Sequence, residues 1–322
     1  RSTPLRVALA RVVHDESHDI KKSFGFINIK LQYSRGNMAK QILSNAVLLE
    51  GDELEVTRGY FVIRDGMIEE IGEGAPSKRG KDIKRAFVLP PFINAHTHIA
   101  DSVAKDIYLG KAQPQVVGPG GAKFRELGLR TEGEIITAVR STLIDMLHTG
   151  TLAHCDFREG GLAGIELLRR TSNPSVSSII LGRPSTPDEL DEILKFSDGI
   201  GLPSLEEFEP TSLKRIARKV AAVKKIFAVH VAETSDAQRA SISATGKSEV
   251  GRALELDPSF VVHGTWTTEE DFNAISRAGV HVVFCARANS MLGVGVPPIH
   301  LALATGAKFC LGTDNVTVCQ PN

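Results

Sequence analysis

The sequence is poor in the features that mark secreted, membrane and nucleic-acid-binding proteins. Only four of the 322 residues are cysteines and none forms a Cys-x-x-Cys pair, so no disulfide framework is indicated. No apolar run approaches the roughly 18 residues that cross a bilayer, and residues 7–13 are too short for a signal peptide. Lys plus Arg equal Asp plus Glu at 38 each, so no net charge favours nucleic acid or a membrane as partner. We expect a reducing, cytoplasmic setting and a small-molecule substrate; a homo-oligomer is compatible with the sequence.

The rest of the composition, with 42% apolar and 24% charged residues, is ordinary for a globular protein. Residues 1–37 show no periodicity and no initiator Met, so we expect an extraneous or poorly ordered arm, with Met38 as the natural start. Residues 38–86 contain short alternating runs separated by turns such as Asp65-Gly66, a strong hairpin signal. They predict a partial β-sandwich.

From residue 87 onward, strand-like and helix-like stretches alternate. Residues 131–147, for example, carry apolar side chains at helical spacing. Such alternation is typical of βα units around a parallel sheet, and eight strands predict an α/β fold, a TIM (β/α)8 barrel over residues 87–322. The eight expected strands are 87–96, 150–157, 175–182, 198–202, 226–232, 259–263, 280–285 and 308–314.

Several of these strands end in side chains that can bind a metal ion. His96 and His98 lie one residue apart in a strand and therefore point to the same face. Taken alone, this pair arises easily by chance. The fifth strand, however, ends in His230, the sixth in His263 and the eighth in Asp314. In a barrel the C-terminal strand ends form the active site, and imidazoles with a carboxylate suit Zn²⁺, although Fe²⁺, Mn²⁺ or Ni²⁺ also fit.

The motifs around these residues resemble the amidohydrolase superfamily. They are similar to its branch of cytosine, guanine and adenosine-type deaminases and triazine chlorohydrolases, including predicted archaeal chlorohydrolases. In the expected order, they are Leu89-Pro-Pro-Phe-Ile-Asn-Ala-His-Thr-His98, His230-Val-Ala-Glu233, Val262-His263-Gly264, Asn289-Ser-Met-Leu-Gly-Val-Gly-Val-Pro-Pro298 and Leu311-Gly-Thr-Asp-Asn315.

The resemblance implies a metal site of one ion. Two-metal members bridge their ions with a carboxylated Lys or a Glu at the end of the third or fourth strand, and residues 179–184 and 198–202 contain no Lys. We therefore expect one divalent metal ion, with Zn²⁺ favoured. His263 is expected to polarise the bound water or the substrate. The implied metal ligands are His96, His98, His230 and Asp314.

The resemblance also implies a hydrolytic mechanism. Glu233, three residues after His230, is the expected proton shuttle; the alternative is a surface Glu that begins the next helix. A metal-activated water would attack an sp² carbon, with Asp314 and His263 as further catalytic residues. Hydrolytic deamination of an amino-substituted purine, pyrimidine or related heterocycle is favoured. Dechlorination or amide cleavage is the other hydrolytic interpretation, and a non-catalytic binding protein on this scaffold is the alternative from a different class.

Polar residues after other strands are candidate substrate contacts. An Arg there could bind a carboxylate or phosphate, and an Arg paired with a nearby carboxylate for structural reasons is the alternative. The candidates are Asp156, Arg158, Arg183, Arg287 and Asn289.

The sequence ends eight residues after Asp314. Members of the family continue with a last helix and with strands that complete the β unit. We therefore expect a barrel that lacks this C-terminal completion, in a truncated reading frame or fragment that still carries every predicted ligand.

Overall fold

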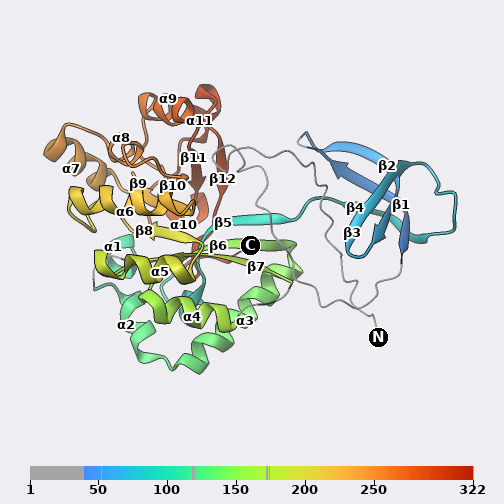
Figure 1. Cartoon of the computed structure of the whole chain (residues 1–322), viewed down its shortest axis with the longest axis horizontal. Helices are drawn as coiled ribbons and strands as arrows, with labels where there is room; N and C mark the ends of the chain where they lie inside the picture. The colour runs from blue at the N-terminus through green and yellow to red at the C-terminus, as the bar shows by residue number, and fades with distance from the viewer. Residues whose placement is uncertain (1–39, 52, 118–119, 172, 174, 322) are drawn as a thin grey trace. The chain divides into compact units, whose positions relative to one another are not determined.

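The computed structural model describes residues 40–51, 53–117, 120–171, 173 and 175–321 (Figure 1). The expected N-terminal arm of residues 1–37 lies outside these described residues. The described chain forms two compact units that part between Phe92 and Ile93. Each unit has its own sheet and its own buried apolar cluster.

The first unit is a four-stranded sheet. Its strands are β1 (Gln41–Glu50), β2 (Glu55–Arg64), β3 (Met67–Glu73) and β4 (Lys81–Val88). They lie in the order β3-β2-β1-β4, with β4 parallel to β1 and the other neighbours antiparallel. Asp65 and Gly66 both have left-handed backbones between β2 and β3, as a two-residue hairpin turn requires.

The start of the first barrel strand differs from the sequence prediction. Residues 87–96 were expected to form one strand, but Phe87 belongs to β4, and the barrel strand β5 (Phe92–His98) begins only after Pro90-Pro91. Proline lacks a backbone N–H and restricts the residue before it. One hydrogen-bonded strand therefore cannot run through this pair.

The second unit contains a curled sheet of parallel strands. After β5 come β6 (Thr151–Arg158), β7 (Ser177–Gly182), β8 (Gly199–Leu202), β9 (Ile226–Val231), β10 (Phe260–His263), β11 (His281–Phe284), β12 (Phe309–Leu311) and β13 (Asp314–Asn315). Neighbours in sequence are neighbours in the sheet from β5 to β12. The predicted TIM-barrel fold is confirmed.

The eighth barrel strand is one stretch broken at Gly312-Thr313. Its first half, β12, pairs with β11, and its second half, β13, pairs with β5. The same stretch therefore joins the two edges of the sheet. It also brings Asp314, at the start of β13, beside the histidines of β5.

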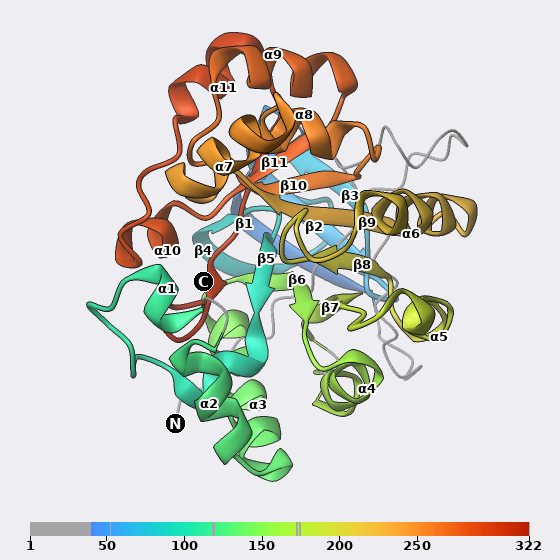
Figure 2. The ribbon, with the colours of Figure 1, turned by 90° about the vertical axis from the view of Figure 1, so that its left-hand side faces the viewer.

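Helices follow the strands and cover the outside of the barrel. Figure 2 shows α4, α5, α6 and α9 outside the strands. The helix expected at 131–147 is α3, which Thr131 caps by accepting a hydrogen bond from the Glu134 backbone. The helices are α1 (Gln113–Val116), α2 (Ala122–Leu129), α3 (Glu132–His148), α4 (Gly161–Thr171), α5 (Leu190–Phe196), α6 (Pro210–Ala222), α7 (Ser235–Thr245), α8 (Glu249–Leu254), α9 (Glu269–Ala278), α10 (Ala286–Met291) and α11 (Ile299–Thr305).

The described residues bear on two expectations from composition. None of the helices among them is long and apolar enough to cross a bilayer. The four cysteines are all free thiols, and Cys155, Cys285 and Cys319 are buried. They therefore act in this fold as small apolar side chains.

Gly312 is required where the eighth strand passes the first. Its backbone N–H donates to the Phe284 carbonyl, and an added Cβ would lie 2.8 Å from the Cβ of His96. We expect Gly312→Ala to lower the free energy of unfolding by about 1–3 kcal/mol, as overpacking does, and to displace His96. Chemical denaturation would measure this. The control is Gly133→Ala in α3, where an added Cβ meets no atom within 4 Å; equal stability of the two variants would contradict the expectation.

Candidate metal centre

Four strand ends of the barrel bring four metal-competent side chains together. One ligand atom from each lies within 4.8 Å of the others, and all four residues are buried. They come from β5, β9, β10 and β13, which are far apart in sequence. The group consists of His96, His230, His263 and Asp314.

The backbone is turned at these strand ends so that the side chains point to one place. His263 and Asp314 have left-handed φ values of 74° and 62°, and Ala232, next to β9, has 49°. Such a conformation in a residue with a side chain costs of order 1–3 kcal/mol and is concentrated at functional sites. The strained backbone therefore occurs at the residues that form the metal-competent group or lie next to it.

Hydrogen bonds fix which nitrogens of two histidines are free. His230 Nδ1 lies 2.7 Å from the Leu202 carbonyl oxygen, which can only accept, so Nδ1 donates and Nε2 keeps a lone pair. His263 Nδ1 lies 3.0 Å from Asn289 Oδ1, while the Asn289 amide donates to Thr265. Burial, with the neighbouring imidazoles, holds the pKa of His230 well below its usual value. A neutral His230 therefore turns its Nε2 lone pair to the group, and His263 Nε2 lies 3.8 Å from Glu233 Oε2.

His96 and Asp314 supply the third imidazole and the negative charge. His96 Nε2 lies 3.2 Å from Asp314 Oδ1, and burial lowers the pKa of His96 to about 4. Burial alone would raise the pKa of Asp314, but His96 and His263 outweigh it and hold that pKa far below its usual range. Imidazole nitrogens with an ionised carboxylate are a donor set for a divalent cation. The residues therefore fit the metal ion that the sequence predicts.

His98 lies at the edge of this group. Its Nε2 is 3.5 Å from Asp314 Oδ1, and its Nδ1 is 3.0 Å from Glu159 Oε1. The metal-competent group of four thus includes His263, whereas the predicted ligand set includes His98 in its place. The ligand role of His98 stays a prediction.

Glu233 follows β9 and faces the group. Its Oε2 lies 3.8 Å from His263 Nε2, and Gln113 Nε2 donates to its Oε1 over 3.4 Å. Burial raises the pKa of the Glu233 carboxyl. Thr234, the next residue, caps α7. The geometry is compatible with proton transfer at the group.

Two of the candidate substrate contacts are engaged within the protein. Asp156 is fully buried and accepts hydrogen bonds from the Ile99 backbone at 2.5 Å and the Thr97 hydroxyl at 3.1 Å. Arg158 donates to Glu159 Oε2 over 2.9 Å. The contacts of Asp156 hold the ends of β5 and β6 together, and contact of either residue with substrate stays a prediction.

The other three candidates lie in different surroundings. Arg183 pairs with Glu207 at 3.4 Å, and Arg287 donates to the Gln320 carbonyl. Asn289 is fully buried and orients His263 through its side-chain oxygen. Their contact with substrate stays a prediction.

Phe157 is a site residue that the sequence reasoning missed. Its ring lies edge-on to His96 and His230, with centroids 4.4 and 5.0 Å apart. A Cβ at Gly201 would lie 2.5 Å from this ring, so the glycine in β8 makes room for it. The alternation of β6 could have placed Phe157 on the inner face.

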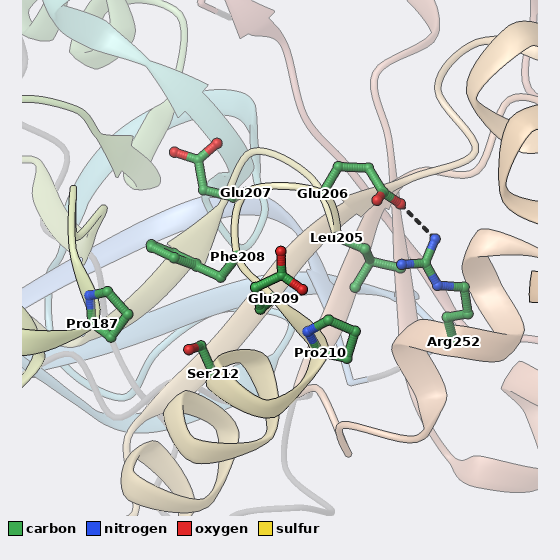
Figure 3. A pocket seen from close by; sticks show the side chains of 9 residues that line it. All are labelled: Pro187, Leu205, Glu206, Glu207, Phe208, Glu209, Pro210, Ser212 and Arg252. Carbon is green, nitrogen blue, oxygen red and sulfur yellow. Dashed lines mark hydrogen bonds and ion pairs between the residues drawn. The ribbon is translucent and has the colours of Figure 1, made fainter. Parts of the chain in front are cut away.

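A hollow of about 430 Å³ lies elsewhere in the second unit, after β8 (Figure 3). It shares no lining residue with the metal-competent group. Figure 3 shows Glu206 turned toward Arg252, with which it forms an ion pair at 2.5 Å. The lining residues are Pro187, Leu205, Glu206, Glu207, Phe208, Glu209, Pro210, Ser212 and Arg252. Glu206 is paired with Arg252 and Glu207 with Arg183, so we place no chemistry there.

Fold and site together define a class of protein. A closed barrel of parallel strands with imidazoles and a carboxylate at its C-terminal strand ends is the architecture of a metal-dependent barrel enzyme. The chain belongs to the amidohydrolase family, whose family model matches residues 87–320.

Three comparisons narrow the class. A protein of Methanothermobacter thermautotrophicus named "Putative aminohydrolase" is 36% identical over 295 residues, covering 87% of this chain and 77% of the relative. A 5-methylthioadenosine/S-adenosylhomocysteine deaminase of Pyrococcus abyssi is 25% identical, covering 85% and 69%. The crystal structure of atrazine chlorohydrolase from Arthrobacter aurescens TC1 complexed with zinc has a TM-score of 0.73 at 15% identity, covering 87% and 73%. The protein is a hydrolase of carbon–nitrogen bonds that acts on small molecules.

Proposed function

We propose that the protein is a mononuclear metal-dependent deaminase of an amino-substituted heterocycle, a purine, a pyrimidine or a related ring. The observation that carries the proposal is the buried group of three imidazoles and an ionised Asp314 with Glu233 beside it. The name of the Pyrococcus abyssi relative, a deaminase of adenosine-type compounds, supports the reaction class. We propose as ligands His96, His98, His230 and Asp314.

One ion, Zn²⁺, is the proposed cofactor. Among the residues that the structure describes, a single group of metal-competent side chains was found. Gly201 lies in the fourth barrel strand. A longer side chain at this position would collide with the ring of Phe157, which fills the space. Imidazole and carboxylate donors suit Zn²⁺, and a structural relative was crystallised with zinc. Fe²⁺, Mn²⁺ and Ni²⁺ suit the same donors.

The proposed mechanism gives each side chain one task. When bound, a divalent ion supplies the Lewis acidity that lowers the pKa of water toward neutrality. His263, fixed by Asn289, presents Nε2 to orient the attacking water or the substrate, and Asp314, held ionised, accepts a proton. Glu233 accepts the other proton of the water and carries it to the departing nitrogen, and the proton on Asp314 passes to the ring nitrogen. Water and the amine are converted to a carbonyl product and ammonia.

An ammonia-release screen tests the proposal. Zinc-loaded full-length protein would be given aminated purines, pyrimidines and triazines, each paired with its chloro-substituted analogue. We expect ammonia from at least one aminated ring and faster turnover of the amine than of its analogue. Chloride release without ammonia release would instead support the dechlorinase, which the chlorohydrolase relative favours. No turnover of any compound by zinc-loaded protein would contradict the proposal.

The pH profile of kcat/KM tests the task of Glu233. Because burial raises the pKa of this carboxyl, it gains its proton at a higher pH than a free glutamate does. Below that pKa it can no longer accept a proton from water, so kcat/KM is expected to fall as pH falls through the raised pKa. A profile that stays flat down to the usual pKa of glutamate would contradict this task.

A further inference from the structure

A cluster of buried charged side chains lies behind His98. Lys123 of α2 places its ammonium 2.9 Å from Asp101 Oδ2 and 2.7 Å from Glu159 Oε1. Arg158 donates to the other carboxylate oxygen, Glu159 Oε2, over 2.9 Å. The side chains of Lys123 and Asp101 are 3% and 0% exposed. Burying charged groups is costly unless they are paired, so the arrangement needs an explanation.

The cluster connects three separate segments to the metal-competent group. Asp101 lies in a short helix directly after β5, Lys123 lies in α2, and Glu159 follows β6. Two carboxylates face one ammonium and one guanidinium, and the guanidinium also lies 3.7 Å from the buried Asp156 Oδ1. The member that reaches a strand-end histidine is Glu159, with Oε1 3.0 Å from His98 Nδ1.

The contacts of Glu159 fix the carboxylate on both sides. Lys123 and Arg158 can only donate, so both oxygens of Glu159 act as acceptors. The carboxylate facing His98 is therefore an acceptor, and a neutral His98 carries its hydrogen on Nδ1.

That assignment has a consequence at the other ring nitrogen. A histidine that binds a metal ion must be neutral, so with its hydrogen on Nδ1 a ligand His98 offers the lone pair of Nε2, which lies 3.5 Å from Asp314 Oδ1. Two acceptors that face each other repel unless a cation lies between them. A carboxylate that holds the far nitrogen of a ligand histidine is a recurring device in metal sites.

We propose that Glu159 is the positioning residue of His98, and that the contact with Lys123 couples this position to α2. Glu159 holds Nδ1 so that Nε2 points toward Asp314, where the proposed metal ion would bind. The inference rests on the metal site proposed above and assigns a role to a residue outside it. Lys123 prevents Glu159 from turning away, so the seating of α2 affects how firmly His98 is held.

Zinc affinity of the metal-free protein tests the proposal without any substrate. Competition with a chromogenic chelator would give the dissociation constant of full-length wild type and Glu159→Gln. We expect about 10- to 100-fold weaker binding in the variant, the usual effect of removing such a partner. The matched control is Glu206→Gln, which removes a carboxylate paired with Arg252 in the same unit and should leave the affinity unchanged.

A double-mutant cycle separates positioning from a general structural role. In a His98→Ala background, Glu159→Gln should have no further effect on zinc affinity, because the side chain that it holds is gone. Lys123→Gln leaves the Glu159 carboxylate in place, so it should weaken zinc binding less than Glu159→Gln does. In the His98→Ala background it should likewise have no effect. Only variants that unfold cooperatively in the absence of metal are compared, because cooperative unfolding shows that the variant is folded.

Two results would overturn the proposal. Zinc affinity of Glu159→Gln within twofold of wild type would show that His98 needs no such partner. An equal loss of affinity with and without His98 would show that the cluster only stabilises the fold. If wild type itself bound no zinc, the proposed metal site would fail first, and that result is distinct from both.

Discussion

Glu233→Gln is expected to lower kcat for amine release about 10²- to 10⁴-fold, the usual contribution of a general acid–base group. Glutamine keeps the size of the side chain and can still accept a hydrogen bond from Gln113, but it cannot carry a proton. Since Glu233 lies 3.8 Å from His263 and outside the proposed ligand set, bound zinc should stay at the wild-type level. Steady-state rates and metal content of the same preparation measure both quantities.

Glu206→Gln is the matched control for this variant. It makes the same chemical change at a carboxylate paired with Arg252 and outside the metal-competent group, so kcat should match that of wild type. Full activity of Glu233→Gln would remove the proton-shuttle role and leave the metal site untouched. Loss of zinc together with activity would instead show that Glu233 is a ligand.

His230→Ala is expected to remove the metal ion and, with it, the activity. The structure gives His230 a neutral ring whose Nδ1 is fixed by the Leu202 carbonyl and whose Nε2 faces the group. Alanine removes one of the three imidazole donors of the proposed ligand set. Because metal-ion stabilisation of a transition state is worth several kcal/mol, we expect a loss of more than about a thousandfold in kcat/KM.

Metal content after dialysis and residual ammonia release would be measured on His230→Ala. His300→Ala is the control, since His300 is exposed on α11 and lies outside the group. Zinc binding by His230→Ala at the wild-type level would contradict the proposed site. Activity without zinc would contradict the proposed mechanism.

The sequence predicted the barrel well because its signal is local. Strand and helix patterns alternate along the chain, and a polar residue at the end of an apolar strand is visible in a window of a few residues. His230 and His263 were found in this way, and the structure places both in the metal-competent group. The break at Pro90-Pro91, in contrast, was missed: one strand was predicted over residues 87–96, although proline is a local signal against a continuous strand.

The surroundings of the site could not be predicted in the same way, because they depend on contacts between distant segments. Lys123 and Glu159 are 36 residues apart, and no spacing rule indicates that they pair. Asn289 was named as a candidate substrate contact, and the bond of its oxygen to His263 Nδ1, 3.0 Å long and across 26 residues of chain, was not predicted. Such partners are determined by packing in three dimensions, and a single sequence does not show which distant segments pack together.

Zinc titration of metal-stripped full-length protein, followed by ammonia release, tests the central claim most directly. A mononuclear metal-dependent deaminase should be inactive without metal, gain activity in proportion to added zinc and reach a plateau at one equivalent per chain. Ammonia release that is unchanged by metal removal would contradict the metal-dependent site. A plateau that is reached only at two equivalents would contradict its single ion.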